Sequence, residues 1–145
     1  MTNPYRILVT GSRDWNDRAA VDDVLTALAA ANTFHNRTTV IVHGACPTGA
    51  DAMADDWARW HAARSPLIEL ERHRANWRPG GKLDRSAGFR RNTEMVQLGA
   101  DVVLAFISPC TKPNCRQPKP HGSHGATHCA DLAEQAGIPV RRWTA

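Results

Sequence analysis

Residues 39–54 read TVIVHGACPTGADAMA, and this stretch decides the fold. Its first five residues form a near-continuous apolar run, which is typical of a strand buried on both faces of a parallel sheet. Gly44 and Gly49 belong to the loop that follows, and a helical pattern of apolar residues runs from Gly49 to Arg64. A buried strand that leads through a glycine loop into a helix is the building unit of a doubly wound α/β domain.

The same unit recurs along the chain. Further aliphatic runs predict strands at residues 5–10, 66–70, 101–106 and 138–142, and helical patterns lie at residues 17–31, 87–98 and 126–136. We therefore expect an α/β, Rossmann-like doubly wound fold: a mainly parallel five-stranded sheet with helices on both faces, in the common strand order 3-2-1-4-5. The length of 145 residues predicts a single domain over residues 1–145.

Composition narrows the class of protein. The chain is 42% hydrophobic and 22% charged, which is ordinary for a soluble globular domain. Its net charge of +4 is too mild to argue for nucleic-acid binding by itself. Because the sequence shows neither a signal-peptide pattern nor an apolar run near the ~18 residues of a membrane span, we expect a cytoplasmic protein with no membrane contact. Its four cysteines should then be reduced or metal-bound rather than bridged.

Three expected strand ends carry glycine and small polar residues that lead into a helix. Ligands of open α/β sheets bind beyond the carboxyl ends of the strands, where glycine lets the backbone approach and helix N-termini attract phosphate. The expected ligand-binding residues of these loops are Gly11, Ser12, Arg13, Asp14, Gly44, Gly49, Ala50, Asp51, Gly122, Ser123, Gly125, Ala126 and Thr127. Arg90 and Arg91 are added on their charge, and Asn92 only on the family resemblance, both described below. A phosphate-bearing ligand is the natural expectation for such a set.

The loop at residues 43–51 nearly matches a phosphate-binding P-loop, but Ala50 stands where that motif has lysine. ATP hydrolysis of the P-loop kind is therefore disfavoured. Thr48 and Asp51 fit a capping box, in which Asp51 would reach back to the Thr48 amide. The alternative is that this loop contacts sugar hydroxyls or phosphate through its backbone.

Arg90 and Arg91 stand near the start of an expected helix, where positive charge opposes the helix dipole. A bound anion would relieve that cost, and pairing of Arg90 with Glu94 is the alternative. Both arginines belong to a basic stretch, residues 72–91, that also contains Trp77. A nucleic-acid surface is conceivable there, but we favour cations that steer a small anionic ligand.

A loop rich in Pro, Cys and His occupies about residues 108–125. Its Cys110, Cys115, His121 and His124 are four plausible zinc ligands, although their spacing fits no standard zinc module. The other interpretations are a surface loop with incidental cysteines, and histidines that touch the substrate. The sequence leaves these three open.

Several motifs, in order, resemble the YspA-like (cpYpsA-related) branch of the SLOG superfamily. They are Gly11-Ser-Arg13, His43-Gly-Ala-x3-Gly-Ala-Asp51, Trp77, Gly81-Lys82, Ala87-Gly-x-Arg-Arg-Asn92, the glycine loop at residues 122–127 and Gly137-Ile-Pro-Val140. The resemblance implies a Rossmann-like domain that binds nucleotides or nucleotide-derived ligands, with LOG-type phosphoribohydrolases and DprA as distant relatives. It also implies a homo-oligomer, to which Trp57 and Trp60 would add aromatic surface.

Two departures from the family pattern bear on activity. The late glycine loop follows an insertion instead of directly following the fourth strand, and Cys129 stands where the LOG-type enzymes carry glutamate. A thiol cannot replace that carboxylate. We therefore expect a nucleotide-binding sensor or sequestering module. The alternatives are a hydrolase of a nucleotide or nucleoside monophosphate, with Asp14, Asp51 or a metal-bound water as the base, and a nucleic-acid-binding protein related to DNA processing.

Overall fold

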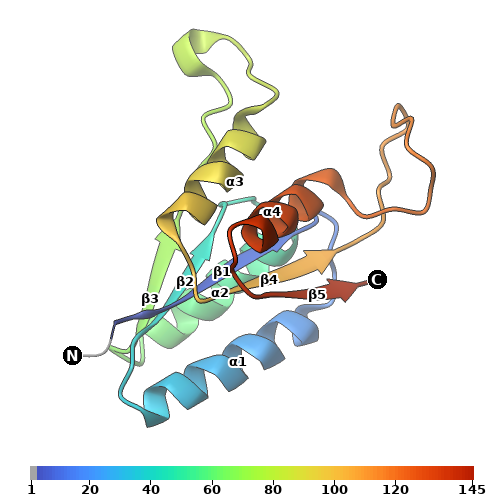
Figure 1. Ribbon diagram of the computed structural model, residues 1–145. Helices are drawn as coiled ribbons and strands as arrows, with labels where there is room; N and C mark the ends of the chain where they lie inside the picture. Colours follow the sequence, from blue (N-terminus) through green and yellow to red (C-terminus); the bar gives the residue numbers. More distant parts are fainter. Residues whose placement is uncertain (1–2) are drawn as a thin grey trace.

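The computed structural model describes residues 3–145 and confirms the α/β, Rossmann-like doubly wound architecture (Figure 1). Five strands alternate with four α-helices. The strands are β1 (Tyr5–Gly11), β2 (Thr39–His43), β3 (Ile68–Arg72), β4 (Val102–Ile107) and β5 (Val140–Thr144). The helices are α1 (Arg18–Phe34), α2 (Gly49–Ala62), α3 (Ala87–Leu98) and α4 (His124–Gln135), with a short 3-10 turn at Pro79–Gly81.

The sheet has the order β3-β2-β1-β4-β5, and every neighbouring pair is parallel. In the centre, Ile7 of β1 pairs with Ile41 of β2 and with Val102 of β4. The chain order reverses between β1 and β4, so the carboxyl ends of these two strands flank the switch point at which doubly wound folds bind ligands.

Helices cover both faces of the sheet (Figure 1). Along β1, Ile7 and Val9 pack into a cluster with α1 and α2, whereas Leu8 packs with α3 and α4. This alternation is the period of two that places successive side chains on opposite faces. Because both faces are buried, β1, β2 and β4 read as continuous apolar runs in the sequence.

Element ends differ from the sequence prediction by up to three residues. Strand β3 begins at Ile68 and β5 at Val140, each two residues later than expected, while α1 extends to Phe34 and α4 begins at His124. The earlier start of α4 places His124 and Gly125 in its first turn, beside the expected ligand site. No helix within residues 3–145 is long and apolar enough to cross a membrane.

The expectation of an aromatic surface on α2 is wrong for one of its two tryptophans. Trp57 is a core residue, and its Nε1 donates to Thr26 Oγ1 at 3.0 Å. Trp60 is exposed, and the Arg64 guanidinium lies over its ring at 3.8 Å.

The first turn of α2 lies directly against the loop after β1. A Cβ at Gly11 would collide with Ala50, and one at Gly49 would collide with the carbonyl oxygen of Ser12. Gly49 also has a φ of +73°, which L-residues with side chains adopt only at a cost. Glycine at these two positions is therefore what lets α2 begin next to β1.

Substitution of Gly49 tests this contact. We expect Gly49→Ala to lower the free energy of unfolding by about 3 kcal/mol, because the left-handed backbone and the collision add together. Gly137→Ala is the matched control, since Gly137 has a φ of +79° with nothing within 4 Å of an added Cβ. It should cost about 1 kcal/mol in urea titrations. Equal costs for the two variants would show that the contact is unimportant.

Candidate ligand-binding crevice

A crevice of about 820 Å³ opens beyond the carboxyl ends of the central strands. Its walls come from the loops after β1 and β2, the segment between β3 and α3, the first half of α3, residues 109–112 and the start of α4. This volume falls within the roughly 300–1,000 Å³ that is usual for small-molecule sites. The crevice also occupies the switch point between β1 and β4.

Most of the predicted ligand-binding residues meet in this crevice. Its lining includes Gly11, Ser12, Arg13, Asp14, Gly44, Asp51, Arg91, Asn92, Ser123, Gly125 and Ala126. Five predicted residues are not part of the lining: Gly49, Ala50, Arg90, Gly122 and Thr127. Gly49 and Ala50 join the first two loops, and a Cβ at Gly122 would meet Ile107 and Thr127, so these residues pack the frame of the crevice.

Ser12 ties together the three chain segments at the switch point. Its hydroxyl accepts the Ser108 amide hydrogen at 2.8 Å and is hydrogen-bonded to the Ser123 hydroxyl. The Ser12 amide in turn donates to the Phe106 carbonyl at 2.9 Å. This buried serine therefore holds the β1 loop against the end of β4 and the start of α4.

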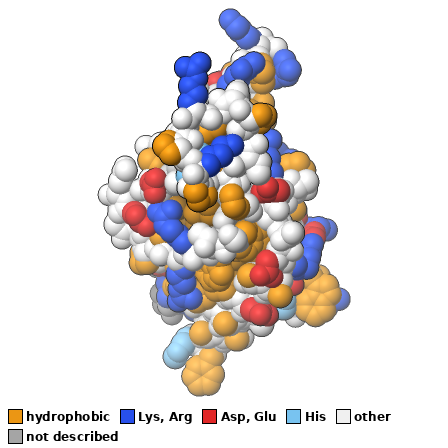
Figure 2. All heavy atoms as spheres, turned by 90° about the vertical axis from the view of Figure 1, so that its right-hand side faces the viewer, with side chains coloured by type: hydrophobic (Ala, Val, Ile, Leu, Met, Phe, Trp, Pro, Cys, Tyr) orange, Lys and Arg blue, Asp and Glu red, His pale blue; other side chains and the backbone are white. Residues whose placement is uncertain are grey.

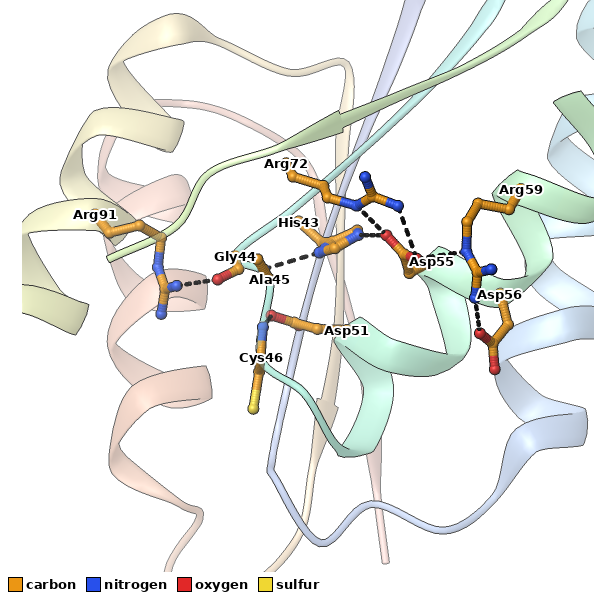
Figure 3. A network of polar contacts seen from close by, with 10 residues as sticks. All are labelled: His43, Gly44, Ala45, Cys46, Asp51, Asp55, Asp56, Arg59, Arg72 and Arg91. Carbon is orange, nitrogen blue, oxygen red and sulfur yellow. Dashed lines mark hydrogen bonds and ion pairs between the residues drawn. The ribbon is translucent and has the colours of Figure 1, made fainter. Parts of the chain in front are cut away.

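The predicted capping box does not form. Thr48 occupies the N-cap position of α2, but its side chain makes no capping hydrogen bond. Asp51 instead turns toward the β2 loop, where it accepts the Cys46 amide hydrogen at 3.2 Å (Figure 3). The loop, rather than the helix end, supplies the donor because Ala45 adopts a left-handed φ of +59° and turns the chain back over α2.

Asp51 is a buried carboxyl in the wall of the crevice. Only 6% of its surface is exposed. Burial raises the pKa of Asp51 above its usual value, and the nearby His43 and Arg91 oppose that rise. A carboxyl with a raised pKa in a cleft is a candidate for proton transfer.

Behind this loop, a polar network fixes the end of β2 (Figure 3). The Ala45 amide donates to His43 Nδ1 at 2.9 Å, so the ring carries its hydrogen on Nε2, which lies 2.8 Å from an Asp55 oxygen. Arg72 and Arg59 also donate to Asp55, at 2.6 and 2.8 Å. Hydrogen bonding by Arg72, together with His43 and Arg59, lowers the pKa of Asp55 well below its usual range.

Helix α3 contributes Arg91 and Asn92 to the crevice. The Arg91 guanidinium donates to the Gly44 carbonyl and to Asn92 Oδ1, and a Cβ at Gly44 would collide with it. Asn92 is buried, and its amide nitrogen lies 3.2 Å from the Gly125 carbonyl. The pair thereby joins the β2 loop, α3 and the first turn of α4.

The two neighbouring arginines have different positions. Arg90, which was expected to bind the ligand, is not part of the lining and forms an ion pair with Asp84; the alternative partner, Glu94, is not used. The reason is that Asp84 lies just before α3, where its side chain also accepts the Ser86 amide hydrogen at 2.9 Å. Of the two arginines, only Arg91 lies in the lining.

The lining carries more positive than negative charge. Its cations are Arg13, Arg74, Arg85, Arg91 and Lys112, against the two carboxylates Asp14 and Asp51. No carboxylate of residues 3–145 forms a salt bridge with any of these five cations, whereas Arg72 and Arg90 nearby are both paired. The segment between β3 and α3 projects from the domain (Figure 1), and Lys and Arg side chains gather on this projecting segment at the top of Figure 2. The crevice therefore favours an anion.

Exposed apolar side chains form part of the same crevice. Trp77, Leu83 and Phe89 line it and are 40, 47 and 44% exposed. Trp77 has the Arg13 guanidinium 5.9 Å from its ring centre, and Phe89 stacks on His128 at 4.3 Å. Sequence reasoning singled out Trp77 but missed Leu83 and Phe89, because apolar residues in a loop and on a helix carry no signal of their own until the fold exposes them together.

A cluster of Cys110, Cys115, His121 and His124 lies at the edge of the crevice. Their ligand atoms are all within 4.8 Å of one another, so the cluster could hold a metal ion. Cys110 and His124 also belong to the lining. Cys129, by contrast, is a buried core residue of α4, and burial raises the pKa of its thiol to about 11. That thiol is protonated at neutral pH and is no nucleophile.

Sequence comparison relates the chain to a known family and to a phage protein. A family model described as YspA, cpYpsA-related SLOG family matches residues 5–80, which include the first two loops of the crevice. The Gene 61 protein of Mycobacterium phage D29 is 42% identical over 138 residues, covering 93% of each chain. No solved structure matches the chain.

The Asp55 network should make stability depend on pH. The folded-state pKa of Asp55 is depressed, so its contribution is present above the unfolded pKa of about 3.9 and is lost as the pH falls below it. We expect Asp55→Asn to lower the free energy of unfolding by about 1–2 kcal/mol at pH 7, allowing for screening by solvent, and by much less near pH 2. Urea titrations across this range measure the difference.

Asp56→Asn is the control, because Asp56 is exposed and pairs with Arg18 and Arg59 on the surface. It should change stability by less than about 0.5 kcal/mol at any pH. A loss for Asp55→Asn that is the same at pH 2 and pH 7 would contradict the assigned charge.

Proposed function

Because the chain belongs to the YspA, cpYpsA-related SLOG family, we propose that it binds a nucleotide or a nucleotide-derived ligand such as ADP-ribose in the crevice. The observation that carries the proposal is the set of five lining cations without carboxylate partners among residues 3–145, next to three exposed apolar side chains. A nucleotide combines the two matching chemistries, an anionic phosphate and a flat apolar base.

Phosphate recognition is the better supported half of the proposal. Arginine presents a planar fork of donors that matches phosphate oxygens, and Arg13, Arg74, Arg85 and Arg91 converge on one cavity. The helix dipoles of α2 and α4, which begin at Gly49 and His124, add a favourable field for negative charge near the switch point. The exposed rings of Trp77 and Phe89 would then stack against the base.

We favour binding, as a sensor or sequestering module, over catalysis. The LOG-type phosphoribohydrolases, which are distant relatives, carry a glutamate where this chain has Cys129, and the Cys129 thiol is buried and protonated. If the Cys/His cluster holds zinc, its four protein ligands close a tetrahedral shell and leave no position for a reactive water. Neither feature supplies a base for hydrolysis.

One observation favours the second candidate, a hydrolase of a nucleoside monophosphate. Asp51 is a buried carboxyl in the crevice wall whose pKa is raised, which suits a general base. Release of base or phosphate from AMP by the purified protein, abolished in Asp51→Asn, would establish this activity. Under our proposal neither protein forms product, and Asp51→Asn still folds.

Binding to nucleic acid is less well supported, because much of the basic stretch is already engaged. Arg72 bonds to Asp55 and Arg90 to Asp84, while Arg74 and Arg85 line the crevice. Arg78 and Lys82 remain on the projecting segment, which is too few contacts for strong, salt-dependent binding.

A thermal-shift assay tests nucleotide binding directly. We expect AMP or ADP-ribose at about 100 times its Kd to stabilise the protein by about 2.7 kcal/mol, which raises Tm by roughly 8 °C. Adenosine, which lacks phosphate, should have a much smaller effect. Arg13→Ala should weaken AMP binding about tenfold or more, since it removes a charge-assisted contact.

Arg18→Ala is the control, because Arg18 pairs with Asp56 on the outer surface and is not part of the lining. It should bind AMP like the wild type. If no nucleotide shifts Tm, or if Arg13→Ala and Arg18→Ala behave alike, the proposed ligand class is wrong.

A further inference from the structure

We propose that Cys110, Cys115, His121 and His124 form a structural zinc site that holds residues 109–122 against the ligand crevice. Three of the four side chains, Cys110, Cys115 and His121, lie in the segment between β4 and α4, and His124 is the first residue of α4. The site is separate from the cations that would bind phosphate, although it shares a wall with them.

Four interatomic distances in the cluster match the edges of a tetrahedral zinc shell. Zn–S bonds of about 2.3 Å and Zn–N bonds of about 2.0–2.1 Å require edges of about 3.3 Å between two nitrogens and about 3.6 Å between sulfur and nitrogen. The two His Nε2 atoms are 3.2 Å apart. Three sulfur-to-nitrogen distances are 3.6, 3.5 and 3.4 Å. Four of the six distances among the ligand atoms are thus at the spacing of one shared ion, and all six are within 4.8 Å.

The histidine geometry independently indicates a metal ligand. His121 Nδ1 lies 2.9 Å from the Pro118 carbonyl oxygen, which can only accept a hydrogen bond. The ring therefore carries its hydrogen on Nδ1, and its Nε2 lone pair points into the cluster. Metal-binding histidines usually donate their other ring N–H to a carbonyl or carboxylate in this way. The His124 ring is stacked on that of His121, and the two Nε2 atoms are neighbours.

The insertion has no apolar core of its own to stabilise it. From Pro109 to Pro120, every residue except Cys110 and Cys115 is exposed. None of the three hydrophobic clusters of the domain includes a residue between 109 and 123. Short segments of this kind depend on cross-links, and a metal site supplies one.

Backbone contacts bring the ligand pairs together at the base of the insertion. The Cys110 amide donates to the His121 carbonyl at 2.7 Å, the Ser123 amide donates to the Ser108 carbonyl at 2.9 Å, and Pro109 and Gly122 form an antiparallel bridge. These contacts hold Cys110 and His121 at the base of the loop, near the end of β4 and the start of α4. An ion bound there would therefore tie β4 to α4.

The donor set specifies the metal and its role. Two thiolates and two imidazoles in a tetrahedron select zinc among the common divalent ions. Four protein ligands also complete the shell, which makes the site structural rather than catalytic. The thiolates would be consumed as ligands, which removes Cys110 and His124 as a nucleophilic pair.

A consequence for the crevice rests on the proposed function. Cys110 and His124 line the crevice together with Lys112, Ser123 and Gly125. Loss of the metal would leave this wall of the crevice without its cross-link, so nucleotide affinity should depend on zinc occupancy. By linkage, a bound nucleotide should also strengthen zinc binding by the same factor.

Metal analysis of the purified full chain tests the site without reference to any ligand. We expect about one zinc ion per chain, and tetrahedral thiolate absorption bands when cobalt replaces it. Cys115→Ser and His121→Ala should lose the metal yet stay folded, because neither residue belongs to a core cluster or to the crevice lining. Arg116→Ala, exposed in the same loop, and Cys46→Ser, a thiol outside the cluster, should keep it.

Chelation of the wild-type protein should lower Tm by at least about 5 °C, and added Zn²⁺ should restore it. Where AMP binds, chelation and Cys115→Ser should each weaken it at least about fivefold. Wild-type protein that takes up no zinc, a Cys115→Ser variant that retains it, or a Cys110–Cys115 disulfide would overturn the proposal. A protein that binds zinc but no nucleotide would refute the proposed function and leave the zinc site intact.

Discussion

The contact between the first turn of α2 and the loop after β1 is the constraint on which the crevice depends. Glycine at positions 11 and 49 removes the side chains that would keep the two segments apart. With α2 begun so close to β1, Asp51 comes to lie under the β2 loop and accepts its Cys46 amide. The same loop then passes close enough to α3 for the Gly44 carbonyl to bind Arg91. A collision at the first contact would displace each of the later ones.

Electrostatic pairing explains why cations remain available in the crevice. Two carboxylates outside the lining already have partners, since Asp55 bonds to Arg72 and Arg59 and Asp84 pairs with Arg90. Of the two carboxylates in the lining, Asp14 is exposed and Asp51 is buried, and burial favours the neutral form of Asp51. The cationic lining is therefore poorly neutralised by the described part of the protein. An anion from solution is the charge that would balance it.

The sequence predicted the sheet well because each central strand is buried on both faces and so appears as an unbroken apolar run. It predicted that the glycine loops meet at one edge of the sheet because strand order and parallel direction place the strand ends together. It failed where local patterns compete with tertiary contacts. Thr48 and Asp51 have the spacing of a capping box, but the folded-back Ala45 turn offers Asp51 a better placed amide.

Arg90 and Arg91 are adjacent in sequence, and only the helix phase decides which one faces the crevice. The Cys/His spacing alone does not reveal the cluster, because backbone contacts between residues 108–110 and residues 121–123 bring its members together.

Two departures from the family pattern acquire a common physical meaning once they are placed in the fold. Cys129 replaces an acidic residue with a buried thiol whose pKa of about 11 keeps it neutral, so α4 supplies no acid or base to the crevice from that position. The insertion before α4 brings four soft ligands to the start of the same helix, where a closed metal shell would stiffen the wall without offering a reactive water. From these two positions, the α4 side would supply no reactive group, while the dipole of α4 still favours negative charge. Under the proposed function, this side of the crevice would help to hold an anionic ligand, and any acid–base chemistry would fall to Asp51 on the α2 side.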